Sequence, residues 1–337
     1  MSHLCKTLIA TTSAWLLVSG LLCLPAVGRE AKLVLYPQKA PAELGKWTLL
    51  PPESLLIEGD AVPLYEKAAQ ALPDKAGDDQ IRKWLDMPIG QLPLDQVEEV
   101  LAQYTDSLKA VARAVKCRRC NWPEWTPGTG TKYLAECRRL AFVVRLWARL
   151  EIADEEYEGA ILALQTTLGM SRHIGQAPTI VQVLVGTAIG GLGCAQIEEF
   201  VQGRGAPNLY LALASLPKPF VLMDKAIETE KKAARSQIGM ADPLDAAHDR
   251  CRIIVKRFEA NLAALQCVEA IRSYAASHDG QLPQTLAEIT EVSIPKDPVT
   301  DGPFRYTRTG STAVLESAVP AGGSEKDRTR YAITIGN

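Results

Sequence analysis

Hydrophobic and polar positions along the chain recur mainly at helical spacing, and they predict a protein organised around one apolar helix. The helix is expected at 179–201, and from Ile180 to Ile197 only Gln182, Thr187 and Gln196 interrupt a run of small or apolar residues. A helix that is apolar on every side has to be enclosed by protein or by lipid. Because the rest of the chain supplies amphipathic helices, we expect those helices to enclose it in a soluble core.

The apolar helix also contains Gly186 and Gly190, whose G-x-x-x-G spacing lets a neighbouring helix approach closely. The same spacing occurs where helices pack in a bilayer, so a membrane-embedded component that uses 179–201 is an alternative. The run has no cationic flank, and glycines interrupt it, which favours the soluble core.

Apolar residues at spacings of three and four predict further helices at 95–115, 133–152, 157–174 and 242–278. Asp95 and Glu98 have the spacing of a capping box at the start of the first of these. The last one carries a continuous apolar stripe. Several charged or polar residues lie off that stripe, and we expect them on the exposed face: His248, Asp249, Arg252, Lys256, Glu259 and Arg272.

The pattern changes after residue 280, where prolines mark a loop and period-two alternation predicts short strands near 304–306, 312–316 and 331–335. Near the other end, 32–36 has the composition of one short strand. The predicted fold class is therefore mainly α, a helical bundle followed by a small α+β module with a long helix and a short antiparallel sheet. The expected parts are a signal peptide (1–28), an irregular N-terminal segment (29–60), an α-helical domain (61–240) and an α+β domain (243–337).

The N-terminus predicts export. Lys6 precedes an apolar stretch at 8–24, Pro25 breaks it, and Ala26 and Gly28 occupy the −3 and −1 positions of a cleavage site. This is the pattern of a secretory signal peptide, with an uncleaved membrane anchor as the alternative. We therefore expect a periplasmic or cell-envelope location, with membrane contact only through the signal peptide before cleavage.

Composition and charge narrow the classes of partner. The 337 residues carry a net charge of −2 with both signs scattered, which gives no broad field for nucleic acid or anionic lipid. Aromatic residues make up only 6% of the chain, which favours helices over sheets. We expect no nucleic-acid partner, and instead a protein partner in the envelope.

Two helices at 139–174 resemble a tetratricopeptide-type helical hairpin. The matching residues are Trp147, Ala148, Tyr157, Ala160, Leu164 and Leu168. Small residues let the two helices cross closely, and the tyrosine fills the corner between them. The chain departs from that family at Glu155, where glycine is usual in the turn, and it shows no clean 34-residue repeat.

The C-terminal region, 259–335, resembles the soluble domain of G-type pseudopilins of type II secretion and pilin-like domains in general. The resemblance rests on YAASHDGQLP at 274–283 and PKDPVTDGPFRY at 295–306. It implies a long helix with a small antiparallel sheet laid on it. Some pseudopilins bind Ca²⁺ in their terminal loops, so Asp297 and Asp301 are candidate ligands. The favoured interpretation is that both aspartates shape turns.

The whole layout is also similar to a group of uncharacterised exported bacterial proteins, which share the C-x-x-C loop, the helical hairpin, the A-P-N-L-Y stretch at 206–210 and the pilin-like end. This resemblance implies a layout and no activity.

Six cysteines remain after the signal peptide: Cys117, Cys120, Cys137, Cys194, Cys251 and Cys267. In an oxidising compartment they predict disulfides, of which one pinning the loop at Cys117 and Cys120 is favoured. A zinc site with Cys137 and a thiol redox site are the alternatives. Arg118 and Arg119 would lower the pKa of a neighbouring thiol and so support the redox alternative.

Trp122 and Trp125 lie in the same loop. If exposed, they would form a platform for a sugar or peptide; if buried, they would cover the helical body, which is the more common arrangement.

The sequence contains no familiar catalytic motif, and we assign no catalytic residue and no cofactor. His173 and His278 lie at helix C-terminal ends, where a cation suits the helix dipole. The leading hypothesis is a non-enzymatic binding or scaffolding protein of the bacterial cell envelope, linked to secretion or envelope assembly. The alternatives are a thiol redox or metal-dependent protein centred on the Cys117–Cys120 loop and the membrane-embedded component.

Overall fold

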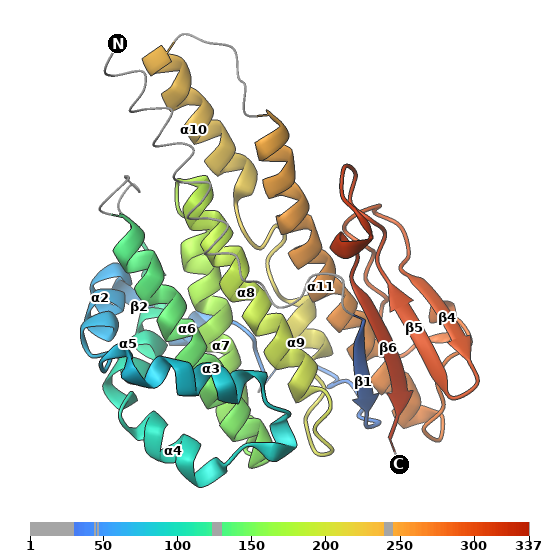
Figure 1. Ribbon diagram of the computed structural model, residues 1–337. Helices are drawn as coiled ribbons and strands as arrows, with labels where there is room; N and C mark the ends of the chain where they lie inside the picture. The colour runs from blue at the N-terminus through green and yellow to red at the C-terminus, as the bar shows by residue number, and fades with distance from the viewer. Residues whose placement is uncertain (1–29, 44, 46, 123–129, 239–244, 337) are drawn as a thin grey trace.

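Three long helices form the middle of the molecule. The computed structural model describes residues 30–336 apart from 44, 46, 123–129 and 239–244. Helices α6 (Gly130–Ala153), α7 (Tyr157–Gly175) and α8 (Ile180–Phe200) pack side by side, as Figure 1 shows. The expected signal peptide, 1–28, lies outside the described residues.

Helix α8 is the apolar helix on which the sequence pattern centres. Its first turn carries a capping box in which the Thr179 hydroxyl accepts a hydrogen bond from the Gln182 N–H. Among the described residues, α8 is the one helix long and apolar enough to cross a membrane, and 72% of its apolar window is buried inside the protein. Neighbouring helices of the same chain therefore enclose it in this structure.

Four short helices cover one side of this layer: α2 (Val62–Gln70), α3 (Asp78–Asp86), α4 (Leu94–Ala102) and α5 (Thr105–Ala114). The prediction of a single helix at 95–115 is wrong. The chain turns at Tyr104, between α4 and α5, so that both short helices pack against α6. Tyr104 is buried in that turn. The expected capping box is also wrong, since α4 begins at Leu94 and has no side-chain cap.

Helices α9 (Tyr210–Ala214), α10 (Met223–Ile238) and α11 (Asp245–Ser277) lie on the opposite side of α8. Helix α11 is the long helix that the stripe predicts. Two residues expected on its exposed face are buried, His248 and Arg272. Both expectations were wrong, and Arg272 is buried because the segments at 36–38 and 206–209 lie over its part of the helix.

A four-stranded sheet packs on the outer side of α11, in the order β1-β6-β5-β4. Strands β4 (Arg305–Thr309), β5 (Thr312–Glu316) and β6 (Arg330–Ile335) are antiparallel neighbours, as the alternation predicts. Strand β1 (Ala31–Leu35) pairs parallel to β6, with Leu33 opposite Ile333. The N-terminal segment thus completes the C-terminal sheet.

A second, small sheet joins β2 (Ile57–Asp60) and β3 (Cys117–Arg119) in parallel. The segment 29–60 was expected to be irregular apart from one short strand at 32–36, and β2 is a second strand in it. Strand β3 begins at the C-x-x-C motif. Short 3₁₀ turns complete the described structure: Glu53–Leu55, Lys75–Gly77, Ile89–Gln91, Leu286–Glu288 and Glu325–Asp327.

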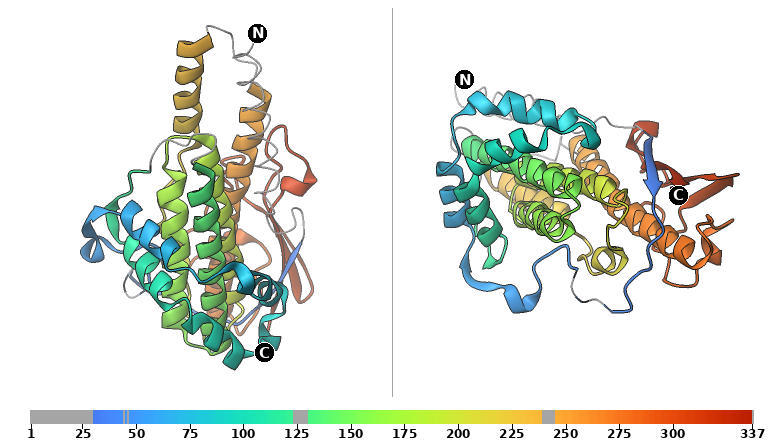
Figure 2. Two further views of the ribbon diagram at one scale, coloured as in Figure 1. Left: turned by 60° about the vertical axis from the view of Figure 1, so that its left-hand side comes forward. Right: turned by 90° about the horizontal axis from the view of Figure 1, so that it is seen from below.

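The largest hydrophobic core crosses the expected boundary near residue 240. It contains side chains of β1, α7, α8, α9, α10, α11 and the C-terminal sheet. Two further cores lie between α6 and the short helices. Figure 2 shows the resulting order of layers: short helices, the α6–α8 layer, α11 and the sheet. The coarse prediction of a mainly helical protein with a small sheet is confirmed.

Glu155 lies in the turn between α6 and α7, at the position where a tetratricopeptide-type hairpin usually has glycine. The backbone of Glu155 has φ 60°, the left-handed region in which glycine is favoured. We expect Glu155→Gly to raise the free energy of unfolding by up to about 1 kcal/mol, because the Cβ strain of that region disappears. Urea denaturation measures this. The control is Asp154→Gly, an exposed neighbour outside that region, which should lower stability instead. Equal values for the two variants would contradict the strain argument.

Candidate functional site

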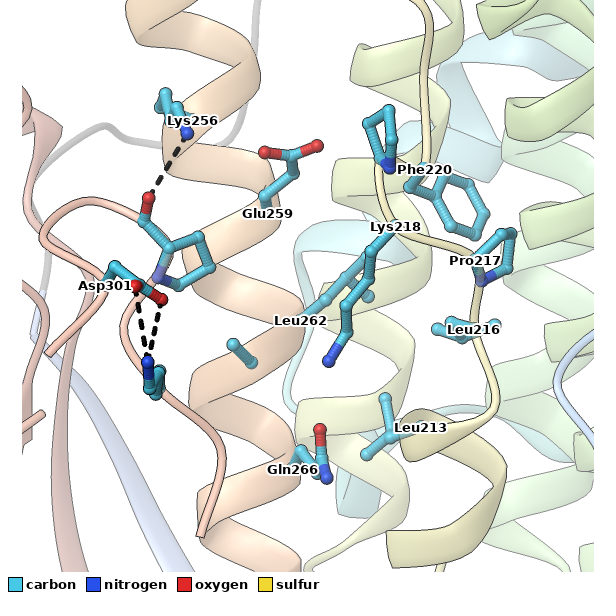
Figure 3. A pocket seen from close by; sticks show the side chains of 14 residues that line it. Leu213, Leu216, Pro217, Lys218, Phe220, Lys256, Glu259, Leu262, Gln266 and Asp301 are labelled. Atoms are coloured by element: carbon cyan, nitrogen blue, oxygen red, sulfur yellow. Dashed lines mark hydrogen bonds and ion pairs between the residues drawn. The ribbon is translucent and has the colours of Figure 1, made fainter. Parts of the chain in front are cut away.

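A cavity of about 510 Å³ opens between the helical body and the C-terminal region. Figure 3 shows it from close by. One wall is the linker between α9 and α10, with Leu216 and Lys218. The facing wall is one side of α11, with Glu259 and Leu262. The loop after residue 295 forms the third wall. We name this cavity the linker pocket.

Helical spacing on α11 and two prolines in the linker position these walls. Glu259, Leu262, Ala263 and Gln266 are three or four residues apart and so share one face of α11. The linker reads Pro217-Lys218-Pro219, and its two prolines keep it from forming a helix. The linker therefore runs past α11 as an extended wall and holds Lys218 at the mouth of the pocket.

The floor of the linker pocket is apolar. Leu213 and Leu216 come from α9 and the linker, while Leu262 and Ala263 come from α11. Behind them Phe220 is buried and packs edge-on against Phe258, with ring centroids 5.6 Å apart. A pocket of this size and lining is typical of small-molecule sites, in which a few polar groups orient a mainly apolar ligand.

Three ammonium groups and two carboxylates surround that floor. Lys256 donates a hydrogen bond to the Pro298 carbonyl at 3.2 Å, and Lys296 pairs with Asp301 at 3.2 Å. The second pair is exposed and contributes little to stability. Figure 3 shows the Lys218 side chain extending from the linker across the pocket.

Glu259 is a half-buried carboxyl in the α11 wall of the pocket. Burial raises the pKa of its carboxyl above the ordinary value, although Lys256 and a backbone hydrogen bond from Phe220 oppose that shift. The bond to Phe220 ties the linker to α11. Lower on the same helix, the buried side chain of Gln266 hydrogen-bonds to the Tyr210 hydroxyl.

The two aspartates considered as calcium ligands act in the turn next to this pocket. Asp297 is buried, and its two carboxylate oxygens accept hydrogen bonds from the N–H groups of Val299 and Ala318. Asp301 is exposed, has φ 57° and pairs with Lys296. The structure gives both residues the arrangement of turn-shaping aspartates.

The C-x-x-C loop lies on the far side of the molecule, beside α2 and α6. Cys117, Cys120 and Cys137 all lie near the buried hydroxyl of Tyr65. Cys194, Cys251 and Cys267 are buried in the largest hydrophobic core, which includes α8 and α11. All six are free thiols in the structure, so the expected disulfides do not form in it and their pairing stays a prediction.

The thiol environments do not match the redox alternative. Burial raises the pKa of Cys117 and of Cys120, and it raises the pKa of Cys137 to about 12. A protonated thiol is a poor nucleophile. Arg118, which was expected to lower these values, pairs instead with Glu53 and Glu58.

The described residues do not form the set of ligands that the zinc alternative requires. Within the described part of the chain, no group of three or more His, Cys, Asp or Glu side chains is placed to hold a metal ion. His173 lies near Cys117, and its Nδ1 is hydrogen-bonded to the Tyr65 hydroxyl at 3.0 Å. Burial lowers the pKa of His173 to about 4, so the expected cation at the end of α7 is neutral at pH 7.

Trp122 does not form an exposed platform. Its side chain is 7% exposed and stacks between Tyr65 and Tyr133, with centroid distances of 5.2 and 5.0 Å. It covers the helical body, the second of the two arrangements considered. Trp125 lies outside the described residues.

Comparisons of the chain with protein-family models, with curated proteins and with solved structures find no match. The resemblances to tetratricopeptide hairpins and to pilin-like domains therefore stay predictions.

The linker pocket was not predicted from the sequence, because its walls come from three segments that are distant along the chain. One signal was available. Lysine stands next to proline twice, in Pro217-Lys218-Pro219 and in Pro295-Lys296, and both lysines line the pocket. Lysines held on rigid, proline-bounded segments are suited to positioning a charge at a site.

Proposed function

We propose that this chain is a non-enzymatic binding and scaffolding protein of the bacterial cell envelope, a helical bundle joined to a pilin-like module. The observation that carries the proposal is the linker pocket. It combines an apolar floor with charged groups at its mouth, the composition of a binding site. It also lies where the helical body meets the C-terminal region, so an occupant would contact both.

Further features agree with this proposal. The hairpin of α6 and α7 places a tyrosine at its corner, where Tyr157 packs against Phe200. Helix α11 carries a small sheet on one side, the order expected of a pilin-like module. The predicted signal peptide supports a location in the cell envelope. The proposed function in secretion or envelope assembly rests on the resemblances to tetratricopeptide-type hairpins and pilin-like domains.

The proposal is tested by affinity capture of the tagged protein at native expression, after mild cross-linking in its own cells. We expect a stoichiometric envelope partner that is lost when Ala263→Phe fills the linker pocket. The matched control is Ala102→Phe, the same substitution on an exposed position of α4. Circular dichroism checks that both variants fold.

Lys218→Glu is a second pocket variant, and because its side chain is exposed it should leave the fold intact. A partner that is retained by both pocket variants would show that the pocket is not the binding site. A specific turnover that depends on a residue of the mature chain would contradict a non-enzymatic function.

A further inference from the structure

Lys218 is a charged residue of the linker pocket whose ammonium group is not engaged by the described part of the protein. Among the described residues, its ammonium group has no hydrogen bond and no ion pair. The other two lysines of the pocket are engaged, Lys256 by the Pro298 carbonyl and Lys296 by Asp301. The carboxylate that α11 contributes to the pocket, Glu259, lies near Lys256 and accepts a hydrogen bond from the Phe220 N–H. Lys218 is therefore available for an anionic group of a ligand.

The walls indicate what should be attached to that anionic group. Pro217, Pro219 and Pro298 line the pocket, and proline has no backbone N–H. A peptide needs main-chain hydrogen-bond donors and acceptors along its length. These walls present ring carbons instead, beside Leu213, Leu216 and Leu262. An alkyl chain, which needs no hydrogen bonds, suits such walls better than a peptide does.

We propose that the linker pocket binds an aliphatic carboxylate, with its head group on Lys218 and its alkyl chain against the leucines of the floor. The inference rests on the proposed binding function and adds the chemical class of a ligand. A volume of about 510 Å³ is within the range of small-ligand sites. Glu259 lies beside Lys256 and accepts the Phe220 N–H, so it does not compete for Lys218.

The test is isothermal titration calorimetry of the full mature chain with three ligands, each with ten carbons in its main chain and used below its micelle concentration: decanoate, decanol and decyltrimethylammonium. We expect decanoate to bind most tightly and the cation most weakly. Octanoate and dodecanoate then vary the tail. Each added pair of methylenes should tighten binding about tenfold until the pocket is full.

Lys218→Gln is the decisive variant. It should weaken decanoate about tenfold or more, the typical effect of a lost charge-assisted hydrogen bond, while leaving decanol unchanged. Lys225→Gln is the matched control, an exposed lysine at the start of α10 and outside the pocket, and it should change neither ligand.

The outcomes separate this inference from the proposed function. If decanol binds as tightly as decanoate, or if Lys218→Gln changes nothing, the assignment of an anionic head group is overturned. If none of the three ligands binds, the aliphatic class is overturned. In both cases capture of an envelope partner, and its loss in Ala263→Phe, still decides the binding function by itself.

Discussion

Replacing Arg272 with methionine should lower the free energy of unfolding by about 3–5 kcal/mol, the usual cost of breaking a buried ion pair. Arg272 is 0% exposed. Its guanidinium donates to both carboxylate oxygens of Glu269 at 3.0 and 2.9 Å, and to the carbonyls of Tyr36 and Ala206 at 3.1 and 2.9 Å. Methionine fills similar space but leaves the Glu269 carboxylate and two carbonyls without this donor.

The network around Arg272 joins three parts of the chain. The Glu269 carboxylate also accepts the Leu209 N–H at 2.9 Å. Asn208 donates to the carbonyls of Gln38 and Glu269, both at 2.9 Å. The segment after β1, the loop before α9 and helix α11 therefore share one set of buried and partly buried hydrogen bonds. Its loss should affect the attachment of β1 as well as global stability.

Arg252→Met is the matched control for this prediction. Arg252 lies on the same helix and also makes two ion pairs, with Asp224 and Asp249 at 3.0 Å, but its side chain is 43% exposed. Exposed pairs contribute at most about 1 kcal/mol, so this variant should be nearly as stable as the wild type. Urea denaturation of both variants measures the difference.

The double variant Arg272→Met with Glu269→Leu provides a further check. It removes both charges together, so it should recover part of the loss seen with Arg272→Met alone. If Arg272→Met and Arg252→Met cost the same, the buried network does not hold these segments together.

Arg272 also shows what helical periodicity leaves out. The apolar stripe of α11 correctly marks the side that faces α8. Periodicity describes one helix in isolation, however, and it cannot show that distant segments cover the opposite side. The residues that bury Arg272 come from 36–38 and 206–209, far from it in sequence.

Local signals nevertheless predicted the long helices well. Helices α7, α8 and α11 begin and end within three residues of the predicted ranges, because Gly175, Pro178 and Asp279-Gly280 mark their ends. The pairing of β1 with β6 joins opposite ends of the described chain. No local pattern specifies such a pairing, although the strand itself was predicted at 32–36.

The candidate site could be predicted only in fragments. Asp297 was assigned to a turn, and its two backbone hydrogen bonds have that arrangement. The linker pocket next to it is formed where the linker with Lys218 runs past α11. Only the tertiary structure shows that these two segments are neighbours. Charged residues of α11 such as Glu259 were placed on an exposed face, whereas the linker half-buries Glu259.

Replacing Gly186 with alanine should destabilise the protein by about 1–3 kcal/mol, because α8 crosses α7 too closely for a side chain at this position. An added Cβ would lie 2.5 Å from the backbone N of Gly175, 2.7 Å from its Cα and 2.8 Å from the Ser171 carbonyl oxygen. These are backbone atoms of α7, which cannot rotate away. The Ser171 hydroxyl also donates to the Gly186 carbonyl at 2.8 Å, and separation of the helices would break that bond.

Gly159→Ala separates this packing effect from helix propensity. Alanine in place of a helical glycine gains up to about 1 kcal/mol when nothing obstructs it. At Gly159 the added Cβ would meet the end of the Glu151 side chain, which can move aside. We therefore expect opposite signs in urea denaturation, with Gly159→Ala as stable as the wild type or more so. A Gly186→Ala variant that is equally stable would mean that α7 and α8 can separate without loss, and the G-x-x-x-G spacing would then not define their contact.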